Sequence, residues 1–560
     1  TVMQLNKAFG EPAVEFADGW DGKAVYDNGK LTVDAKASTG ILSAVRDLFS
    51  KDEGKQQIFS IKYQIPVSMR QDQDIEYSLE SCEYSSDEGT WTNSFRKKTV
   101  DVTAAYSIDA GVMVEGLSGK ITVTDEDGKP VSGAEIFLSD DDNTLVGKTN
   151  ANGVLLTNKL CQKAGTEYKL YAKKDSSYSY EYKITTAGPS GNDDGTPFNI
   201  AHNAAKKGTS SETITWMANS KSADGNAVVE YRTEGSEAER AEGSSNVQQF
   251  PQSKDSVHIN KVELSGLKSG TIYEYRVGDG SIWSEWGTFR TAAADDKTEF
   301  FVIGDTQLTG NADSDKDAVE LLTKISGDIA KENVDFGLQT GDYVDNAGYS
   351  DKWTQIINLF GSCFGSTDIV HVLGNHEYYG DESGTISNRL IGGDGKDYYS
   401  VEYDDVYVAV INNSANMSEA AEWLAEDALK SDCQWKVLSV HQPPYYTNEK
   451  GSSQGFNKNI PPMAEAAGID VVFSGHDHSY ARTEPLREGK VDEKDGITYF
   501  ICGDLGEKSR DSEYMITTED KFSFAKTTQD YDALYLLVKT DENELSVTAK
   551  DADGTVVDTY

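Results

Sequence analysis

Five short apolar runs after residue 297 each end in residues that can bind a metal, and this regularity limits what the chain can fold into. The runs are separated by helix-like stretches such as 316–332. This alternation predicts an α/β domain in which helices cover a largely buried sheet. The residues that follow the runs are Asp305, Asp342, Asn375, His441, His476 and His478.

Ligands of open α/β sheets bind beyond the carboxyl ends of the strands, so five such ends predict one common site. Four of the seven histidines lie between 376 and 478, whereas residues 1–201 contain none. The absence of cysteine from the set argues against a structural zinc site, and its mixed carboxylate, amide and imidazole groups suit Zn²⁺, Mn²⁺ or Fe. Six ligands are enough for two ions if one carboxylate bridges them. Two ions ~3.5–4 Å apart stabilise an in-line displacement at phosphorus.

The ordered motifs "GD…GDYVD…GNHE…H…GHDH" resemble the calcineurin-like metallophosphoesterase superfamily over roughly 298–510. The segment "GHDHSYAR" (475–482) is similar to the "GHxHxYxR" signature of purple acid phosphatases. In those enzymes a fibronectin III-like sandwich precedes the catalytic domain, as residues 195–293 would do here. The resemblance implies a two-sheet β sandwich flanked by helices. It also implies hydrolysis of phosphate monoesters, as in acid phosphatases, by a metal-activated hydroxide.

The resemblance also implies a role for each residue. Asp342 would bridge two divalent or trivalent ions (Fe, Zn or Mn). The first site would be completed by Asp305 and His478, and the second by Asn375, His441 and His476. His376 would stabilise the phosphoryl oxygens or protonate the leaving alkoxide, and Asp477 would be a spacer. Alternate residues of an extended segment point the same way, so His476 and His478 can each serve one metal.

Two positions depart from the family pattern. Gln307 replaces the usual histidine of the first motif, so it is either a weaker ligand or a hydrogen-bond partner of a ligand. Asp345 stands where purple acid phosphatases carry the tyrosine that colours their ferric iron, and Tyr343 has the wrong offset. The sequence therefore predicts a colourless enzyme.

The rest of the chain reads as β-sandwich modules ahead of the α/β domain. Trp216, Tyr273 and Tyr275 fit core positions of the fibronectin-like module. The predicted domains are a β-rich segment of unknown role at 1–112 with a short helix at 41–54, a small β sandwich at 113–188, the fibronectin-like domain at 195–293, and the catalytic domain at 298–560, closed by a hairpin at 535–560.

Charge and composition exclude some classes of protein. Lys plus Arg number 52 against 94 Asp plus Glu, a net charge of −42. This charge argues against a nucleic-acid groove or adhesion to an anionic membrane. The sequence has no apolar run long enough to span a membrane. We expect an extracellular or surface protein of a bacterium, with any signal or anchor outside this chain and possible wall-polymer or glycan contacts through its N-terminal modules.

Two alternatives remain open from the sequence. One is a phosphodiesterase or nucleotidase with the same metal site, and the other is a surface binding protein whose phosphoesterase domain is vestigial. The loops at 445–457 and 507–530, with Tyr514 and Phe522, either shape the substrate pocket or are plain surface loops.

Overall fold

The computed structural model describes two compact units. Unit 1 contains residues 1–110, 121–155 and 167–184, and unit 2 contains 111–120, 156–166 and 185–560. Of the first 103 residues, the structure describes 2–4, 13–16, 20–27, 30–37, 59–62, 73–86 and 89–102. From 104 onward it describes all residues except 111–112, 116–118, 141–142, 176, 189–190, 192–193, 222–224, 312–313, 394, 450–453 and 506–514.

The first part of unit 1 consists of strands in its described segments. One sheet has the order β3-β4-β1-β6-β7, and β2 pairs with β5. The helix expected at 41–54 lies outside the described residues. The strands are β1 (Val2–Gln4), β2 (Ala13–Phe16), β3 (Trp20–Asp27), β4 (Lys30–Ala37), β5 (Phe59–Lys62), β6 (Gln73–Ser86) and β7 (Gly89–Val102).

The next segment forms two small sheets around a core that includes Ile121, Val123, Ile136 and Leu170, all fully buried. The sheets have the orders β11-β10-β13-β14, with β15 on β13, and β12-β9-β8. The Asp125 carboxylate accepts the N–H groups of Asp127 and Lys129, as expected of a turn aspartate. The strands are β8 (Tyr106–Ala110), β9 (Gly119–Asp125), β10 (Glu135–Leu138), β11 (Leu145–Lys148), β12 (Val154–Thr157), β13 (Glu167–Lys174), β14 (Ser177–Tyr178) and β15 (Tyr182–Thr185).

Unit 2 begins with a two-sheet sandwich, called here the small domain (residues 198–290). Trp216, Tyr273 and Tyr275 are all buried in its core, as predicted. One sheet has the order β19-β18-β22-β23, and the other is β20-β21-β17-β16. The strands are β16 (Phe198–Asn203), β17 (Ser211–Asn219), β18 (Val228–Arg232), β19 (Glu239–Glu242), β20 (Ser244–Gln249), β21 (Ser256–Ser265), β22 (Ile272–Gly278) and β23 (Gly287–Arg290).

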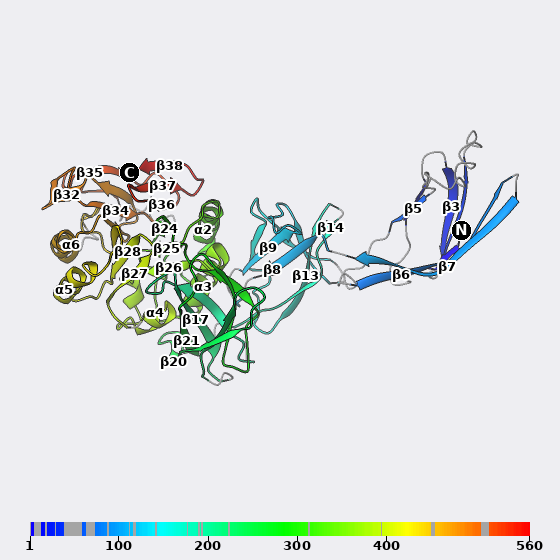
Figure 1. Cartoon of the computed structure of the whole chain (residues 1–560), viewed down its shortest axis with the longest axis horizontal. Helices are drawn as coiled ribbons and strands as arrows, with labels where there is room; N and C mark the ends of the chain where they lie inside the picture. Colours follow the sequence, from blue (N-terminus) through cyan, green and yellow to red (C-terminus); the bar gives the residue numbers. More distant parts are fainter. Residues whose placement is uncertain are drawn as a thin grey trace. The chain divides into compact units, whose positions relative to one another are not determined.

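The next domain (residues 298–560) is the one predicted to be catalytic, and it is called the catalytic domain below. It contains two facing sheets (Figure 1). The first has the order β26-β25-β24-β36-β37-β38, and the second β27-β28-β29-β30-β34-β31-β35. Its strands are β24 (Thr298–Ile303), β25 (Phe336–Gln339), β26 (Asp368–His371), β27 (Tyr398–Tyr403), β28 (Val406–Ile411), β29 (Trp435–Val440), β30 (Val471–Ser474), β31 (Tyr480–Thr483), β34 (Thr498–Cys502), β35 (Phe524–Thr528), β36 (Leu534–Thr540), β37 (Leu545–Asp551) and β38 (Val556–Thr559), besides the hairpin β32 (Leu486–Arg487) and β33 (Lys490–Val491).

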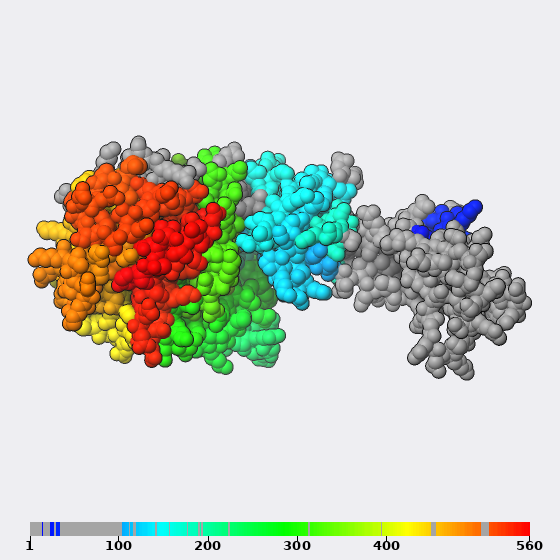
Figure 2. Space-filling model, turned by 90° about the horizontal axis from the view of Figure 1, so that it is seen from above, coloured from blue at the N-terminus to red at the C-terminus, as the bar shows by residue number. Residues whose placement is uncertain are grey.

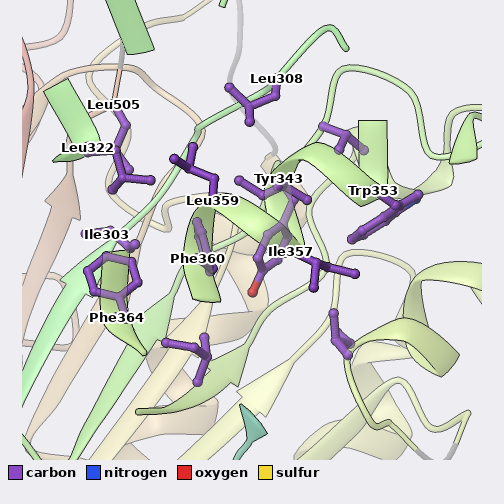
Figure 3. Close-up of a cluster of buried hydrophobic side chains, with 14 of the residues drawn as sticks. Ile303, Leu308, Leu322, Tyr343, Trp353, Ile357, Leu359, Phe360, Phe364 and Leu505 are labelled. Carbon is purple, nitrogen blue, oxygen red and sulfur yellow. The ribbon is translucent and has the colours of Figure 1, made fainter. Parts of the chain in front are cut away.

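Alternating side chains divide this domain into four layers. Phe300 and Val302 of β24 face the second sheet, whereas Phe301 and Ile303 face the helices α2 and α3 (Figure 3). The helices α5 and α6 cover the outer face of the second sheet. The helices are α2 (Lys316–Ile329), α3 (Ser350–Phe364), η3 (His376–Tyr378), α4 (Thr385–Leu390), α5 (Met417–Ala428) and α6 (Gln454–Ala467).

The C-terminal strands belong to the catalytic domain, as predicted. Strand β36 pairs antiparallel with β24 and extends the first sheet. Figure 2 shows this segment in red on the surface of the unit. No helix of the described residues is both long and apolar enough to cross a membrane.

The small domain and the catalytic domain share one continuous sheet. Strand β16 pairs in parallel with β26 through Asn203 and Ile369, so ten strands form a single sheet. Loss of the small domain would therefore expose an edge of the catalytic sheet at β26.

A buried polar chain crosses this seam. Tyr275 Oη lies 2.8 Å from His202 Nε2, and His202 Nδ1 lies 3.2 Å from Glu212 Oε1. One carboxylate oxygen of Glu212 lies within 4.8 Å of one of Asp368, and Tyr403 donates to Asp368 Oδ2 at 2.8 Å. Burial lowers the pKa of His202 to about 4 and raises that of Glu212 to about 8. Burial also raises the pKa of Asp368, so both carboxyl groups favour the protonated form at neutral pH.

Glu212 makes stability depend on pH. Its pKa rises from 4.5 to about 8 on folding, so between these values the folded chain keeps a proton that the unfolded chain has lost. Rising pH then lowers the free energy of unfolding, by at most about 1.4 kcal/mol per pH unit. We expect Glu212→Gln, which keeps a donor but does not titrate, to flatten this dependence in denaturant unfolding between about pH 6.5 and pH 8, above the range in which His202 contributes the opposite slope. Glu263→Gln, at an exposed position on β21, is the control. Parallel profiles for wild type and Glu212→Gln would contradict the expectation.

Candidate metal centre

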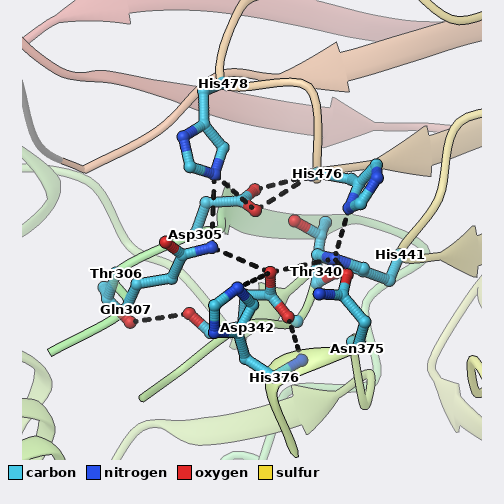
Figure 4. Close-up of polar contacts among 12 residues, drawn as sticks. Asp305, Thr306, Gln307, Thr340, Asp342, Asn375, His376, His441, His476 and His478 are labelled. Carbon is cyan, nitrogen blue, oxygen red and sulfur yellow. Dashed lines mark hydrogen bonds and ion pairs between the residues drawn. The ribbon is translucent and has the colours of Figure 1, made fainter. Parts of the chain in front are cut away.

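The five apolar runs are strands, and the polar residues after them meet at one edge of the two sheets (Figure 4). Strands β24, β25 and β26 are parallel neighbours in the first sheet, and β29 and β30 are parallel neighbours in the second. Their carboxyl ends therefore point to the same side of the domain. The six predicted ligands follow these strands in order: Asp305 after β24, Asp342 after β25, Asn375 after β26, His441 after β29, and His476 and His478 after β30.

One half of the site is built around His441, which is fully buried. Its Nε2 atom lies 3.2 Å from Asp342 Oδ2, 3.2 Å from Asn375 Oδ1 and 3.2 Å from His476 Nδ1. Asp342, His441 and His476 thus offer three ligand atoms within 4.8 Å of one another.

The other half lies on the opposite side of Asp342. His478 Nε2 is 3.5 Å from Asp305 Oδ1. The amide nitrogen of Gln307 is 2.9 Å from Asp342 Oδ2 and 3.3 Å from His478 Nε2. In this arrangement Gln307 is a hydrogen-bond partner of Asp342, one of the two alternatives for this residue. All six residues predicted as ligands are brought together, with Asp342 between the two groups.

The chemistry of the His441 group fits a metal cation. His441 Nδ1 donates to the carbonyl oxygen of Thr340 at 2.9 Å, the contact that fixes the tautomer of many metal-binding histidines. In the neutral ring, Nε2 is then an acceptor that faces a carboxylate oxygen and an amide oxygen, so either a metal ion between them or a proton on Nε2 is needed. Burial favours the neutral ring, but the Asp342 carboxylate outweighs burial and raises the pKa of His441 to about 10.

The backbone at the site is held in an unusual conformation. Five residues of the motifs have positive φ angles between 40° and 73°, a region that side chains other than glycine rarely adopt. Such strain persists where the surrounding structure imposes it, and it is typical of functional sites. These residues are Asp305, Gln307, Asp342, His476 and His478.

The glycines that precede the ligands are required by close packing. A Cβ atom at Gly374 would overlap Asp342 Oδ1 and lie 2.8 Å from His441 Nε2. A Cβ atom at Gly475 would overlap Asp305 Oδ2. Glycine therefore lets the ligand side chains approach the backbone at these two positions.

His376 lies at the edge of the site, with 24% of its side chain exposed. Its Nδ1 atom contacts the carbonyl oxygen of Asp345 at 2.9 Å, and its Nε2 atom is 3.8 Å from Asp342 Oδ2. Its backbone N–H donates to Asp342 Oδ1 at 3.0 Å. The ring is thus close to the centre without belonging to the ligand groups.

Glu377, a fully buried carboxylate behind the centre, has a role that was not predicted from the sequence. Its oxygens accept the backbone N–H groups of Asp342, Tyr343 and Gly374 at 2.8–2.9 Å. Glu377 therefore fastens the second motif to the third. Its position in the motif "GNHE" was the one indication of a role in the sequence. The residue type alone does not reveal hydrogen bonds to backbone groups that are distant in sequence.

Asp477 is more than the predicted spacer. Its side chain is buried, and its Oδ2 atom accepts the backbone N–H of Thr447 at 2.6 Å and the hydroxyl of Thr447 at 3.0 Å. The turn that carries His476 and His478 is thereby tied to the 445–449 loop. Phe522 packs against Tyr446 in that loop at 5.0 Å between ring centroids, and Tyr514 lies outside the described residues.

The tyrosine of the purple enzymes has no counterpart at this centre. The Asp345 carboxylate pairs with Lys352. Tyr343 is buried in the core that packs against α3 (Figure 3), and its hydroxyl contacts His371.

Comparisons with known proteins agree with this architecture. Residues 298–480 match the family described as Calcineurin-like phosphoesterase, and residues 197–291 match Purple acid Phosphatase, N-terminal domain. Purple acid phosphatase 18 of Arabidopsis thaliana is 27% identical over 324 residues, which cover 53% of this chain and 68% of that protein. Acid phosphatase type 7 of Mus musculus is 22% identical over 267 residues, covering 42% and 59%.

A purple acid phosphatase, PPD1 from yellow lupin seeds, has the same fold with a TM-score of 0.56 and 15% identity, covering 82% of this chain and 96% of its own. The chain therefore contains a calcineurin-like phosphoesterase domain with a purple acid phosphatase N-terminal domain before it. It is an enzyme with a dinuclear metal centre that hydrolyses phosphate esters, as predicted. The alternative of a vestigial domain in a binding protein is not favoured. The small domain matches the family of purple acid phosphatase N-terminal domains. That it is a fibronectin III-like domain stays a prediction.

His441→Ala tests the ligand set. Mutation of a residue that hydrogen-bonds to a metal ligand typically lowers metal affinity or activity about 10–100-fold. We therefore expect removal of a ligand itself to lower kcat by more than about 100-fold. Elemental analysis should find two ions per wild-type chain and fewer in the variant. His258→Ala, on β21 of the small domain, is the control. Full activity and full metal content in His441→Ala would refute the assignment.

The absence of a tyrosine at position 345 predicts a colourless protein even when iron is bound. An absorption spectrum of the iron-loaded enzyme should show no charge-transfer band in the visible range. Asp345→Tyr is the informative variant, because it restores the residue type found in purple enzymes. A purple wild-type preparation would show that another tyrosine reaches the iron.

Proposed function

We propose that Asp305, Asp342, Asn375, His441, His476 and His478 hold the two ions and that the enzyme is a phosphomonoesterase. Asp342 would be shared by both ions, Asp305 and His478 would complete one site, and the remaining three would complete the other. The observation that carries this proposal is the position of His441 Nε2, 3.2 Å from both Asp342 Oδ2 and Asn375 Oδ1. Fe, Zn and Mn suit this mixture of donors.

When bound, the ions supply Lewis acidity, which lowers the pKa of water and neutralises charge on the phosphoryl oxygens. His376 is the catalytic residue that the protein itself adds. Because its Nδ1 atom faces the Asp345 carbonyl, its Nε2 edge is the one that serves the substrate. From there it stabilises a phosphoryl oxygen or gives a proton to the leaving alkoxide.

We expect a small phosphorylated substrate, which would lie beside the loop at 445–449. The 445–449 loop stands beside the His476–His478 turn through Asp477, and Lys521 contacts Tyr446 and Glu449 of that loop. The relatives' names, acid phosphatases of plant and mouse, support the monoester preference.

Turnover of p-nitrophenyl phosphate and of its bis ester distinguishes phosphomonoesterase activity from phosphodiesterase activity. We expect the monoester to have the higher kcat/KM, and we expect chelation to abolish its hydrolysis until Fe, Zn or Mn is returned. A clear preference for the bis ester would identify a phosphodiesterase with the same metal centre. Activity that survives exhaustive chelation would contradict the metal mechanism.

We also propose an extracellular, surface-associated location. Two observations support it: the β-rich modules ahead of the catalytic domain, and the net charge of −42. A glycan or wall-polymer contact of residues 1–190 belongs to the same proposal. Cell fractionation followed by the phosphatase assay tests it, because a cytosolic location of the activity would exclude it.

A further inference from the structure

We propose that the loop Phe250–Asp255 of the small domain, called here the tip loop, positions His376 for catalysis and that Gln252 is the residue through which it acts. The inference rests on the proposed role of His376. It assigns to the small domain a part in the reaction itself.

His376 is held by few contacts. Its Nδ1 atom has the Asp345 carbonyl oxygen at 2.9 Å, and the Tyr379 ring packs against its imidazole with a centroid distance of 4.7 Å. Asp345 begins the segment 345–350, and Tyr379 is followed by Gly380. The direction in which Nε2 points therefore depends on these two backbone segments.

Gln252 lies between the same two segments. Its backbone N–H donates to the Gly348 carbonyl oxygen at 3.0 Å. A Cβ atom at Gly348 would overlap Gln252 Oε1. A Cβ atom at Gly380 would meet Asn346 Oδ1 first, at 2.4 Å, and would lie 2.9 Å from Gln252 Oε1 and 3.0 Å from Gln252 Nε2. The Gln252 amide thus fills the space that a side chain at position 348 would occupy, and it also lies against Gly380 beside Asn346.

The two catalytic-domain segments are also joined to each other and to the core. Ala347 donates its backbone N–H to the Tyr379 carbonyl oxygen at 2.9 Å, and the Trp353 indole N–H donates to the Ala347 carbonyl oxygen at 3.0 Å. Displacement of the 345–350 segment would therefore move both supports of His376 together.

The tip loop is itself anchored firmly. Phe250 is fully buried in the core cluster that contains Trp353. Its backbone N–H donates to the Asp255 carbonyl oxygen at 2.9 Å, which closes the loop. On the catalytic side, Ser350 donates its N–H to Ser253 Oγ at 3.2 Å, and its hydroxyl contacts the Asp255 carboxylate. The tip loop is therefore held in place, and Gln252 extends from it towards the two segments that position His376.

Gln252→Ala tests the inference through the leaving group. Misplacement by about 1 Å can cost about 100-fold in rate, and we expect a smaller shift here that lowers kcat for an alkyl phosphate such as glycerol phosphate about 5–20-fold. With p-nitrophenyl phosphate, whose leaving group needs no proton, we expect less than about a 2-fold change. KM and metal content should stay unchanged. Gln248→Ala is the matched control, since it removes a contact of the same domain with Arg389 and leaves the 345–350 segment intact.

Gly348→Ala provides a second route, because its methyl group would push out the Gln252 amide. We expect the same leaving-group dependence, and we expect Gly348→Ala/Gln252→Ala to be no worse than either single variant. Equal losses on both substrates, or wild-type behaviour of both single variants, would overturn the inference. His376→Ala separates this failure from that of the proposed function: equal losses on both substrates in that variant would show that His376 is not the proton donor on which the inference rests.

Discussion

The site depends on one electrostatic constraint: oxygen and nitrogen acceptors from both sheets meet at one point with too few protons among them. His441 Nδ1 is committed to a backbone carbonyl, so its Nε2 atom, Asp342 and Asn375 present lone pairs to one another. Without a metal ion, a proton on His441 relieves this repulsion: burial alone would lower the pKa of the ring, but the Asp342 carboxylate raises it to about 10. The affinity for metal ions is therefore a property of the folded sandwich.

The strained backbone and the motif glycines are consequences of the same constraint. Side chains from strand ends can converge only if the chain turns sharply there, which explains the positive φ angles of Asp342 and His476. Gly374 lets Asp342 and His441 reach their positions. The energy for this strain comes from elsewhere in the domain, because the sheets and their helices form three large apolar clusters.

The sequence could predict the site because each candidate ligand follows a recognisable apolar run. The α/β layers could be predicted from the alternation of strands and helices. The supporting residues could not: Glu377 and Asp477 bind backbone atoms that are distant in sequence, and no periodicity marks such bonds. The sheet that continues across the two domains could not be predicted either, because β16 and β26 pair through a single residue pair and belong to different predicted domains.

That seam changes how the two domains should be viewed. A linker between independent domains would allow relative motion. Here a shared sheet joins the two domains, and the buried carboxyl pair of Glu212 and Asp368 lies across the seam, so the two domains form one rigid body. Rigidity here has a chemical use, because His376 takes its orientation from a peptide carbonyl in a loop and not from the sheets. A loop needs support from outside, and the small domain lies against it through Gln252. The catalytic centre therefore extends, in physical terms, across both domains.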